Sequence, residues 1–438
     1  MALPFSKTYM KSNSLGKYYG FTAFGESHGH SVGLVIEDVL SGIDFPFCEL
    51  RAAIQRRKPA QGYFTTTRKE NDDFEVISGV FEGKTTGMPI CLLFRNVDFR
   101  SEDYEALRNV FRPGHADFSW FQKFKIYDHR GGGRASGRET ISRVAAGAFV
   151  KNILGSIQIR AYPLKIGNIN AATIDFEFMS QNALKWADPE TFDEVMCLLQ
   201  STKEQKDSLG SIVEVVITNV PAGLGDPVFE KLDANLAKAI ISIGGVKGIE
   251  FGTGFALCGM NGSEANLDHH QSGIAGGVSD GKTISMKIAV KPVSSIGKPQ
   301  LMTHFVTGDD PMMTSIKGRH DICLVPRILP VIESMIQLTL ADAIAYQDLI
   351  SSKDKDLNDY REAINKIDED ILIAFYRRFE IVKSIGEYKK KHDLPICDKN
   401  RESEVLNHIS QIAEEFGISA EFAIKIWTLI MEESRDRQ

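Results

Sequence analysis

The segment from Asp128 to Thr140 constrains the fold more than any other stretch of this chain. Four glycines and three arginines fall between Arg130 and Arg138. Glycines allow close backbone approaches that a Cβ would block, and arginines present fixed forks of donors that suit carboxylate and phosphate groups. The apolar residues of 141–149 follow at the spacing of a core-facing helix. The segment therefore predicts an anion-binding loop at a helix N-terminus, with a tight turn carrying exposed arginines as the alternative. Its spacing matches neither the Walker loop nor the dinucleotide fingerprint.

Length and charge narrow the class of protein. The 438 residues exceed one typical core, so two or more domains are expected. A formal net charge of −7 disfavours a general nucleic-acid or membrane-surface binder, and no apolar run reaches transmembrane length. The six cysteines lack disulfide or metal spacing, and the N-terminus has no secretory pattern. We therefore expect a cytoplasmic protein with no metal, nucleic-acid or membrane partner.

Two histidines in predicted loops accompany the glycine-rich segment. His28 lies between Ser27 and Gly29, and His115 follows Arg112 closely. Histidine titrates near neutral pH and serves as a general acid or base. Taken alone, His28 has the context of a turn histidine. Together, the histidines and arginines form a constellation with acid–base capacity.

Other basic and acidic positions extend this pattern. A predicted helix from Phe47 to Arg57 ends in cations, which either complement the helix dipole on a solvated face or contribute to an anion patch. Further glycine-rich loops span 244–254 and 273–281. A predicted apolar helix over about 329–349 carries Asp342 in its apolar half. Because burying an unpaired charge is costly, this acid is expected to be partnered or functional.

The C-terminal tail has a purely helical pattern, after a polar connector at 351–356. Along its first predicted helix, Arg378 and Lys389 project from one face about 16 Å apart. Arg361 lies about 25 Å from Arg378 and is rotated by about 100°, so the two cannot readily share a pocket within one helix. Two chains packed antiparallel would bring them together. Ser434 and Gln438 share a face near the C-terminus.

Four spaced motifs carry a family resemblance. They are Phe24-Gly-Glu-Ser-His-Gly29, Phe111-Arg-Pro-Gly-His-Ala-Asp117, Arg130-Gly-Gly-Gly-Arg-Ala-Ser-Gly-Arg-Glu-Thr140 and Lys317-Gly-Arg-His-Asp321. Over about residues 14–350 the chain resembles chorismate synthase. That family converts 5-enolpyruvylshikimate-3-phosphate to chorismate by 1,4-elimination of phosphate, and it requires reduced FMN although the reaction is redox neutral. The resemblance implies a β-α-β sandwich over residues 1–350 that assembles as a tetramer.

The resemblance also implies roles for individual residues. His28 would protonate the departing phosphate, His115 would protonate or hold the reduced flavin near N1, and Asp342 would act near flavin N5. The candidate ligands of the substrate anions are Arg56, Arg57, Arg112, Arg134, Arg138 and Arg327. The candidate flavin contacts are Arg134, Ala135, Ser136, Gly244, Gly245, Gly276, Lys291, Pro292, Val293, Ser294, Ser295 and Arg319.

Three positions depart from the family pattern. The family's Arg-Ser-Ser-Ala-Arg reads Arg134-Ala-Ser-Gly-Arg138 here, which removes one hydroxyl from the flavin loop. Gly244-Gly245 stands where the family has Asn-Ala, so a side-chain amide contact is lost. Tyr63 replaces an arginine often assigned to the nicotinamide cofactor, which weakens the case for a built-in NADPH-dependent flavin reductase.

The tail resembles the all-helical chorismate mutase family over residues 357–438, without a gap relative to the family's spacing. The resemblance implies three helices in an intertwined dimer, with Arg361 supplied by the partner. The family rearranges chorismate to prephenate without a covalent step, because cations clamp two carboxylates in a compact pose. Lys389 and Gln438 would stabilise charge on the ether oxygen. The matching binding positions are Arg361, Arg378, Lys389, Asp398, Arg401, Glu402, Ser434 and Gln438.

The sequence therefore predicts an α+β synthase domain followed by an all-α mutase domain in one bifunctional enzyme. Two alternatives differ in class. The tail could be a non-catalytic module for dimerisation or for sensing chorismate or prephenate. The whole chain could bind flavin or anions without elimination chemistry. Retention of the complete cation set in the tail favours catalysis.

Overall fold

The computed structural model describes residues 12–58, 72–97, 108, 110–126, 128–267, 270, 272–304, 312–316, 320–351, 357–393, 395, 399–415 and 417–437. The chain divides into two compact units, one ending at Ile350 and the other beginning at Ser351.

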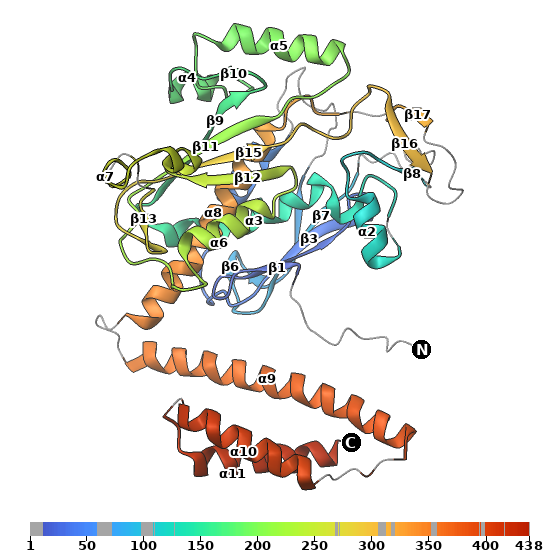
Figure 1. Ribbon diagram of the computed structural model, residues 1–438, viewed down its shortest axis with the longest axis vertical. Helices are drawn as coiled ribbons and strands as arrows, with labels where there is room; N and C mark the ends of the chain where they lie inside the picture. Colours follow the sequence, from blue (N-terminus) through green and yellow to red (C-terminus); the bar gives the residue numbers. More distant parts are fainter. Residues whose placement is uncertain are drawn as a thin grey trace. The chain divides into compact units, whose positions relative to one another are not determined.

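The first unit contains two five-stranded antiparallel sheets (Figure 1). The first sheet has the order β1 (Ser14–Leu15), β2 (Phe21–Gly25), β3 (Ser31–Ile36), β7 (Ile90–Arg95), β4 (Phe74–Ser78). The second has the order β10 (Ile169–Asn170), β9 (Gln158–Ile166), β11 (Ser211–Thr218), β15 (Ile284–Val290), β12 (Val246–Phe251). Burial alternates along β7 and β11, as strands with one covered face require.

A helical layer lies between the two sheets (Figure 1). The helix α3 (Thr140–Val150) packs against β2 and β3 and also against α8 (Val325–Ile350), which packs against β9 and β11. Nine of the eleven residues of α3 are buried, which is the pattern of a helix enclosed on all sides. The helices α1 (Phe47–Arg57) and α6 (Leu232–Ile241) pack against α8 as well. The β-α-β sandwich expected from the sequence is confirmed.

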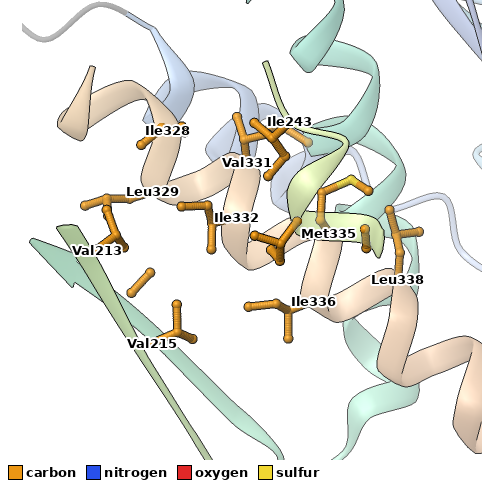
Figure 2. Close-up of a cluster of buried hydrophobic side chains, with 14 of the residues drawn as sticks. Val213, Val215, Ile243, Ile328, Leu329, Val331, Ile332, Met335, Ile336 and Leu338 are labelled. Carbon is orange, nitrogen blue, oxygen red and sulfur yellow. The ribbon is translucent and has the colours of Figure 1, made fainter. Parts of the chain in front are cut away.

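The helix α8 forms the centre of the core. Figure 2 shows Leu329 of α8 close to Val213 of β11, with Ile336 and Val215 lining the same buried cluster. Gly147 lets α3 approach α8 closely, because a Cβ there would stand 2.6 Å from the Cβ of Ser334. Among the described residues, α8 alone is long and apolar enough to cross a membrane. Since 67% of its apolar window is buried inside the fold, its composition is that of a core helix.

Shorter elements surround this sandwich. The strands are β5 (Val80–Phe81), β6 (Lys84–Thr85), β8 (Val110–Phe111), β13 (Ile274–Ala275), β14 (Val278–Ser279), β16 (Gln300–His304) and β17 (Met312–Thr314). The helices are α2 (Asp117–Phe124), α4 (Phe176–Gln181), α5 (Phe192–Glu204) and α7 (Gly262–Ala265). The 3₁₀ turns among the described residues are η2 (Gly133–Ala135), η3 (Gly137–Glu139), η4 (Lys151–Leu154) and η5 (Gly254–Gly259).

The second unit consists of α9 (Leu357–Lys391), α10 (Lys399–Glu415) and α11 (Ala420–Asp436), as the sequence pattern predicts. The helices α10 and α11 pack against each other. The hydroxyl of Ser419 caps α11 by accepting from the Phe422 amide at 3.4 Å. The Arg437 guanidinium lies 4.5 Å from the centre of the Phe379 ring, so the end of α11 contacts the middle of α9.

Candidate functional site

The glycine-rich segment packs directly onto His28. Gly131, Gly132 and Gly133 all have positive φ angles, a conformation that glycine adopts without a Cβ penalty. A Cβ on Gly131 would collide with Cε1 and Nδ1 of the His28 ring, which is only 2% exposed. The Ser27 amide donates to the Gly133 carbonyl at 3.3 Å, and this bond fixes the two loops together. The predicted neighbourhood of His28 and the loop is therefore present in the structure.

Beside this loop, a buried carboxylate joins two arginines. Arg57 Nη2 donates to Asp72 Oδ2 at 2.9 Å, and Arg138 Nη1 donates to Asp72 Oδ1. The three residues are 3%, 5% and 7% exposed in the order Arg57, Asp72 and Arg138. Asp72 has a φ of 53°, an uncommon conformation for a non-glycine residue. Such a strained residue, held by two buried ion pairs, is typical of a functional site.

The guanidinium of Arg327 acts electrostatically on Arg57. Burial lowers the pKa of Arg57 to about 10; Asp72 offsets part of this effect, while the nearby Arg327 and Arg138 lower the pKa further. Arg327 Nη1 donates to Asp321 Oδ2 at 2.6 Å. The Nε atoms of Arg57 and Arg327 are buried without a hydrogen-bond partner among the described residues. Buried donors of this kind normally have partners, so a bound anion fits here.

Asp72 remains ionised in spite of its burial. Burial alone would raise its pKa, but Arg57 and Arg138 together hold the pKa below its usual value. The arginine group of Arg57, Arg138 and Arg327 thus contains three cations and two carboxylates, Asp72 and Asp321. One positive charge is left uncompensated within this set, which favours an anionic ligand.

His115 lies in a second cluster, with the segment 291–295. Its Nδ1 is 2.9 Å from the Pro113 carbonyl oxygen, which can only accept, so Nδ1 carries the hydrogen. In the neutral ring, Nε2 then accepts from the Ser295 hydroxyl at 2.7 Å. Burial, followed by the charge of Arg112, lowers the pKa of His115 to about 4. The ring is therefore neutral near pH 7 in this structure.

Further hydrogen bonds hold this cluster together. Lys291 Nζ donates to the Gly114 carbonyl at 2.7 Å and to the Ser294 hydroxyl at 2.6 Å. Arg112 is fixed by Asp117, to which its Nε donates at 2.7 Å and its Nη2 at 2.8 Å. The Lys291 amide donates to the Gly245 carbonyl at 2.9 Å. The structure thus brings these predicted residues together: Arg112, His115, Gly245, Lys291, Ser294 and Ser295.

Three predicted residues have other partners. Arg56 pairs with Glu333 of α8 at 2.7 Å. Arg134 donates to the carbonyls of Ala23 and Gly25 at 3.1 and 3.3 Å, so it braces β2. The third residue is Asp342, whose partners are backbone amides.

Asp342 does not lie in the arginine group of its own subunit. Its Oδ1 accepts from the backbone amides of Lys17, Tyr18 and Tyr19 at 2.8, 2.6 and 3.1 Å. At 1.5 Å per residue, it is about 22 Å further along α8 than Arg327. The prediction that this acid is partnered or functional is met by partnering.

The remaining predicted flavin positions are dispersed. Ser136 accepts from the Arg138 amide at 3.4 Å and so caps η3. Gly276 forms the β13–β14 turn, where the neighbouring Gly277 carbonyl accepts from the Leu232 amide at 2.8 Å. Gly244 precedes β12, and Ala135 ends η2. Arg319 and Tyr63 lie outside the described residues.

In the second unit, Arg378 of α9 contacts Ser434 of α11. The Arg378 guanidinium donates to the Ser434 hydroxyl, which is 5% exposed, and burial lowers the pKa of Arg378. Glu402 lies 3.8 Å from Arg435. Arg401 donates to Glu404 at 2.9 Å on the exposed face of α10.

Two more of the predicted mutase residues lie on α9. Lys389 is half-buried and Arg361 is exposed. Asp398 and Gln438 lie outside the described residues. Several large apolar side chains of α9 are exposed, including Ile364, Ile367 and Ile371 at 57%, 55% and 45%.

Comparison with known proteins identifies both units. The family model for chorismate synthase matches residues 19–345. The chain is 44% identical to the chorismate synthase of Syntrophus aciditrophicus (strain SB), over 78% of this chain and 100% of that protein.

The chain belongs to the chorismate synthase family.

Other relatives agree with this assignment. The chorismate synthase of Methanocella arvoryzae is 43% identical over 78% of this chain and 96% of that protein. A solved structure described as the crystal structure of chorismate synthase superposes with a TM-score of 0.59 and 26% identity, covering 82% of this chain and 99% of that chain. The model for chorismate mutase type II matches residues 360–438. The chain is thus a bifunctional enzyme of aromatic biosynthesis, with a chorismate synthase lyase and a chorismate mutase isomerase.

The chorismate synthase family implies a reduced flavin, and the cluster around His115 fits an anionic one. Lys291 supplies an ammonium group, Ser294 and Ser295 supply hydroxyls, and the half-buried His115 supplies a ring. Gly114 lets the backbone approach this set, because a Cβ there would stand 2.9 Å from the Ser294 hydroxyl. No group of three or more histidine, cysteine or acidic side chains with metal-binding geometry occurs among the residues with described positions.

Sequence reasoning about the synthase unit missed three carboxylates and one amide. Asp117 and Asp321 stand inside the quoted motifs, so the motifs themselves could have indicated them. Asp72 contacts Arg57 and Arg138, which are distant from it in sequence. Asn96 likewise contacts Glu26, Gly29 and Arg138. No local pattern distinguishes them from surface polar residues.

Proposed function

We propose that the arginine group of Arg57, Arg138 and Arg327 binds the phosphate and carboxylates of 5-enolpyruvylshikimate-3-phosphate. The observation that carries this proposal is the pair of buried Nε atoms of Arg57 and Arg327, which have no hydrogen-bond partner in the part of the chain that the structure describes. Guanidinium groups that are already oriented by Asp72 and Asp321 lose little freedom when they receive an anion.

His28 is the proton donor to the departing phosphate in this proposal. It is buried under the glycine-rich segment, whose Arg138 belongs to the arginine group. A phosphate bound by these arginines would sit near the imidazole. Its negative charge would favour the protonated ring, which is the form that a general acid needs.

FMN is the proposed form of the reduced flavin, held by Lys291, Ser294, Ser295 and His115. When bound, reduced FMN supplies the electron-rich ring that the family's redox-neutral elimination requires. The negative charge of a bound anion would raise the pKa of His115 from the low value that burial imposes. His115 could then hold a proton at Nε2 in place of the hydrogen bond from Ser295.

The second unit is proposed to bind chorismate through Arg378, Lys389, Arg401 and Glu402, with Arg361 contributed by a partner chain. The exposed apolar side chains of α9 support a second chain on that face, since contiguous exposed apolar surface marks an interaction site. The mechanism is electrostatic clamping of the two carboxylates, with charge on the ether oxygen stabilised by Lys389 and Gln438. The tetramer of the synthase unit and a cytoplasmic location remain part of the same proposal.

One anaerobic experiment tests these assignments together. The full chain is supplied with 5-enolpyruvylshikimate-3-phosphate and dithionite-reduced FMN, and chorismate and prephenate are followed in time. We expect chorismate to appear first and prephenate after it. His28→Ala should abolish chorismate formation but still convert added chorismate, whereas Arg378→Ala should accumulate chorismate. Chorismate formation by His28→Ala at the wild-type rate would contradict the role of His28.

Failure of the second unit to convert added chorismate would favour the alternative of a sensor. In that case chorismate or prephenate should alter the rate of the synthase unit, and Arg378→Ala should remove this effect.

A further inference from the structure

Asn96 occupies a buried position between two parts of the proposed synthase site. It follows the last residue of β7 and is 8% exposed. Its side-chain Nδ2 donates to the Glu26 carbonyl at 2.9 Å and to the Gly29 carbonyl at 2.8 Å. Its Oδ1 accepts from Arg138 Nε at 2.9 Å. The side-chain amide therefore donates both hydrogens to the 26–30 loop and accepts from Arg138 with its oxygen.

The orientation of this amide is fixed by its partners. Carbonyl oxygens can only accept and a guanidinium can only donate. In a flipped amide, the oxygen would therefore face the two carbonyl oxygens and the NH₂ group would face the guanidinium. The Asn96 backbone amide also donates to the His30 carbonyl at 3.1 Å. One residue thus attaches the 26–30 loop, which carries His28, to Arg138 of the arginine group.

We infer that Asn96 is a positioning residue that sets the distance between the proton donor His28 and the anion ligand Arg138. This inference rests on the proposed roles of those two residues. A displacement of about 1 Å between catalytic groups can lower a rate by about 100-fold. Asn96 itself touches neither substrate nor flavin in this assignment, because its side chain is saturated by protein atoms.

The variant Asn96→Asp keeps the hydrogen bond to Arg138 and removes the hydrogen bonds to the Glu26 and Gly29 carbonyls. A carboxylate keeps an oxygen for Arg138 but replaces both Nδ2 donors with an oxygen that faces the two carbonyls. We expect kcat for chorismate formation to fall by about 10- to 100-fold. KM should rise as well, because the new carboxylate offsets positive charge of the arginine group. Protonation of the new carboxyl restores one donor, so the ratio of variant to wild-type kcat should rise as the pH falls.

A matched control lies at the end of α4. Asn182 has the same arrangement, with Nδ2 donating to the Phe178 and Trp186 carbonyls at 2.8 Å each and Oδ1 accepting from the Trp186 amide at 3.1 Å. Asn182→Asp should lower thermal stability but leave kcat and KM of the synthase unchanged, with no pH-dependent ratio. The control therefore reports what a purely structural loss does.

The outcomes separate the inference from the proposed function. If the wild-type chain forms chorismate and Asn96→Asp folds with an unchanged kcat, the inference is overturned but the proposed function is not. Absence of chorismate from the wild-type chain overturns the proposed function and the inference with it. If Asn96→Asp does not fold, Asn96→Ala, which lacks the repulsive oxygen, should lower kcat and raise KM. A folded Asn96→Ala chain with wild-type kcat likewise overturns the inference.

Discussion

Asp72 allows two guanidinium groups to remain charged in one buried site. Arg57 and Arg138 each donate to a different oxygen of its carboxylate. Replacing Asp72 with Asn leaves two buried cations without their counter-charge, and removing one partner of a buried ion pair costs about 3–5 kcal/mol. We expect Asp72→Asn to lower the free energy of unfolding by about that amount and to raise KM for 5-enolpyruvylshikimate-3-phosphate. Urea unfolding and steady-state kinetics measure both. The neighbouring exposed Asp73 provides the control, because Asp73→Asn removes only an exposed charge and should change both quantities much less.

The pKa of His115 predicts a pH dependence of stability. Burial lowers this pKa to about 4, below the value near 6.5 that an unfolded chain has. Between these two pH values the unfolded state binds the proton and the folded state does not. Stability is therefore fully present above about pH 6.5 and declines as the pH falls toward 4, by about 1.4 kcal/mol per unit.

His115→Gln isolates this effect, since all other groups titrate in both chains. The difference in the free energy of unfolding between wild type and variant should shrink as the pH falls from about 7 to 5. The charged groups that act on the ring are Arg112, Asp117 and Lys291. A difference independent of pH would show that folding does not change the pKa of His115, which contradicts the lowered pKa.

At the scale of elements, the conformation of the glycine-rich loop depends on its packing onto the His28 ring. Gly131→Ala would place a methyl group in the His28 ring at a φ of 61°. We expect this variant to lower the kcat of the synthase by at least about tenfold, because the histidine must move. Gly137→Ala is the matched control: its Cβ would meet nothing within 4 Å, and its φ is not positive. Equal kinetics of the two variants would refute the packing of this loop onto His28.

The same elements show how far the sequence predicts this fold. The apolar spacing of 141–149 predicts α3, and a helix whose residues are nearly all buried must lie between two layers. The sequence predicts that Asp342 is partnered or functional, and the structure shows that it is partnered. The sequence does not indicate which groups are its partners. Its partners are backbone amides more than three hundred residues away. Asp72 and Asn96 escaped prediction for the same reason, because tertiary contacts of long sequence separation leave no local pattern.

At the scale of the whole molecule, one chain carries two consecutive reactions, but its mutase unit is proposed to need a second chain. The pair Arg378 and Ser434 is formed within one chain, whereas Arg361 is exposed. If each mutase site combines Arg378 of one chain with Arg361 of the other, the chains Arg361→Ala and Arg378→Ala should each be inactive as mutases.

Co-expression of these two variants tests the shared site. In a symmetric dimer, a mixed pair contains one site with both arginines replaced and one site with both intact. Random pairing should therefore restore about a quarter of the wild-type mutase activity per chain. The synthase activity serves as the control, because neither substitution lies in that unit and chorismate formation should stay constant throughout. Mixed chains without mutase activity would show that Arg361 and Arg378 of the same chain form each site, and the exposed apolar side chains of α9 would then need another explanation.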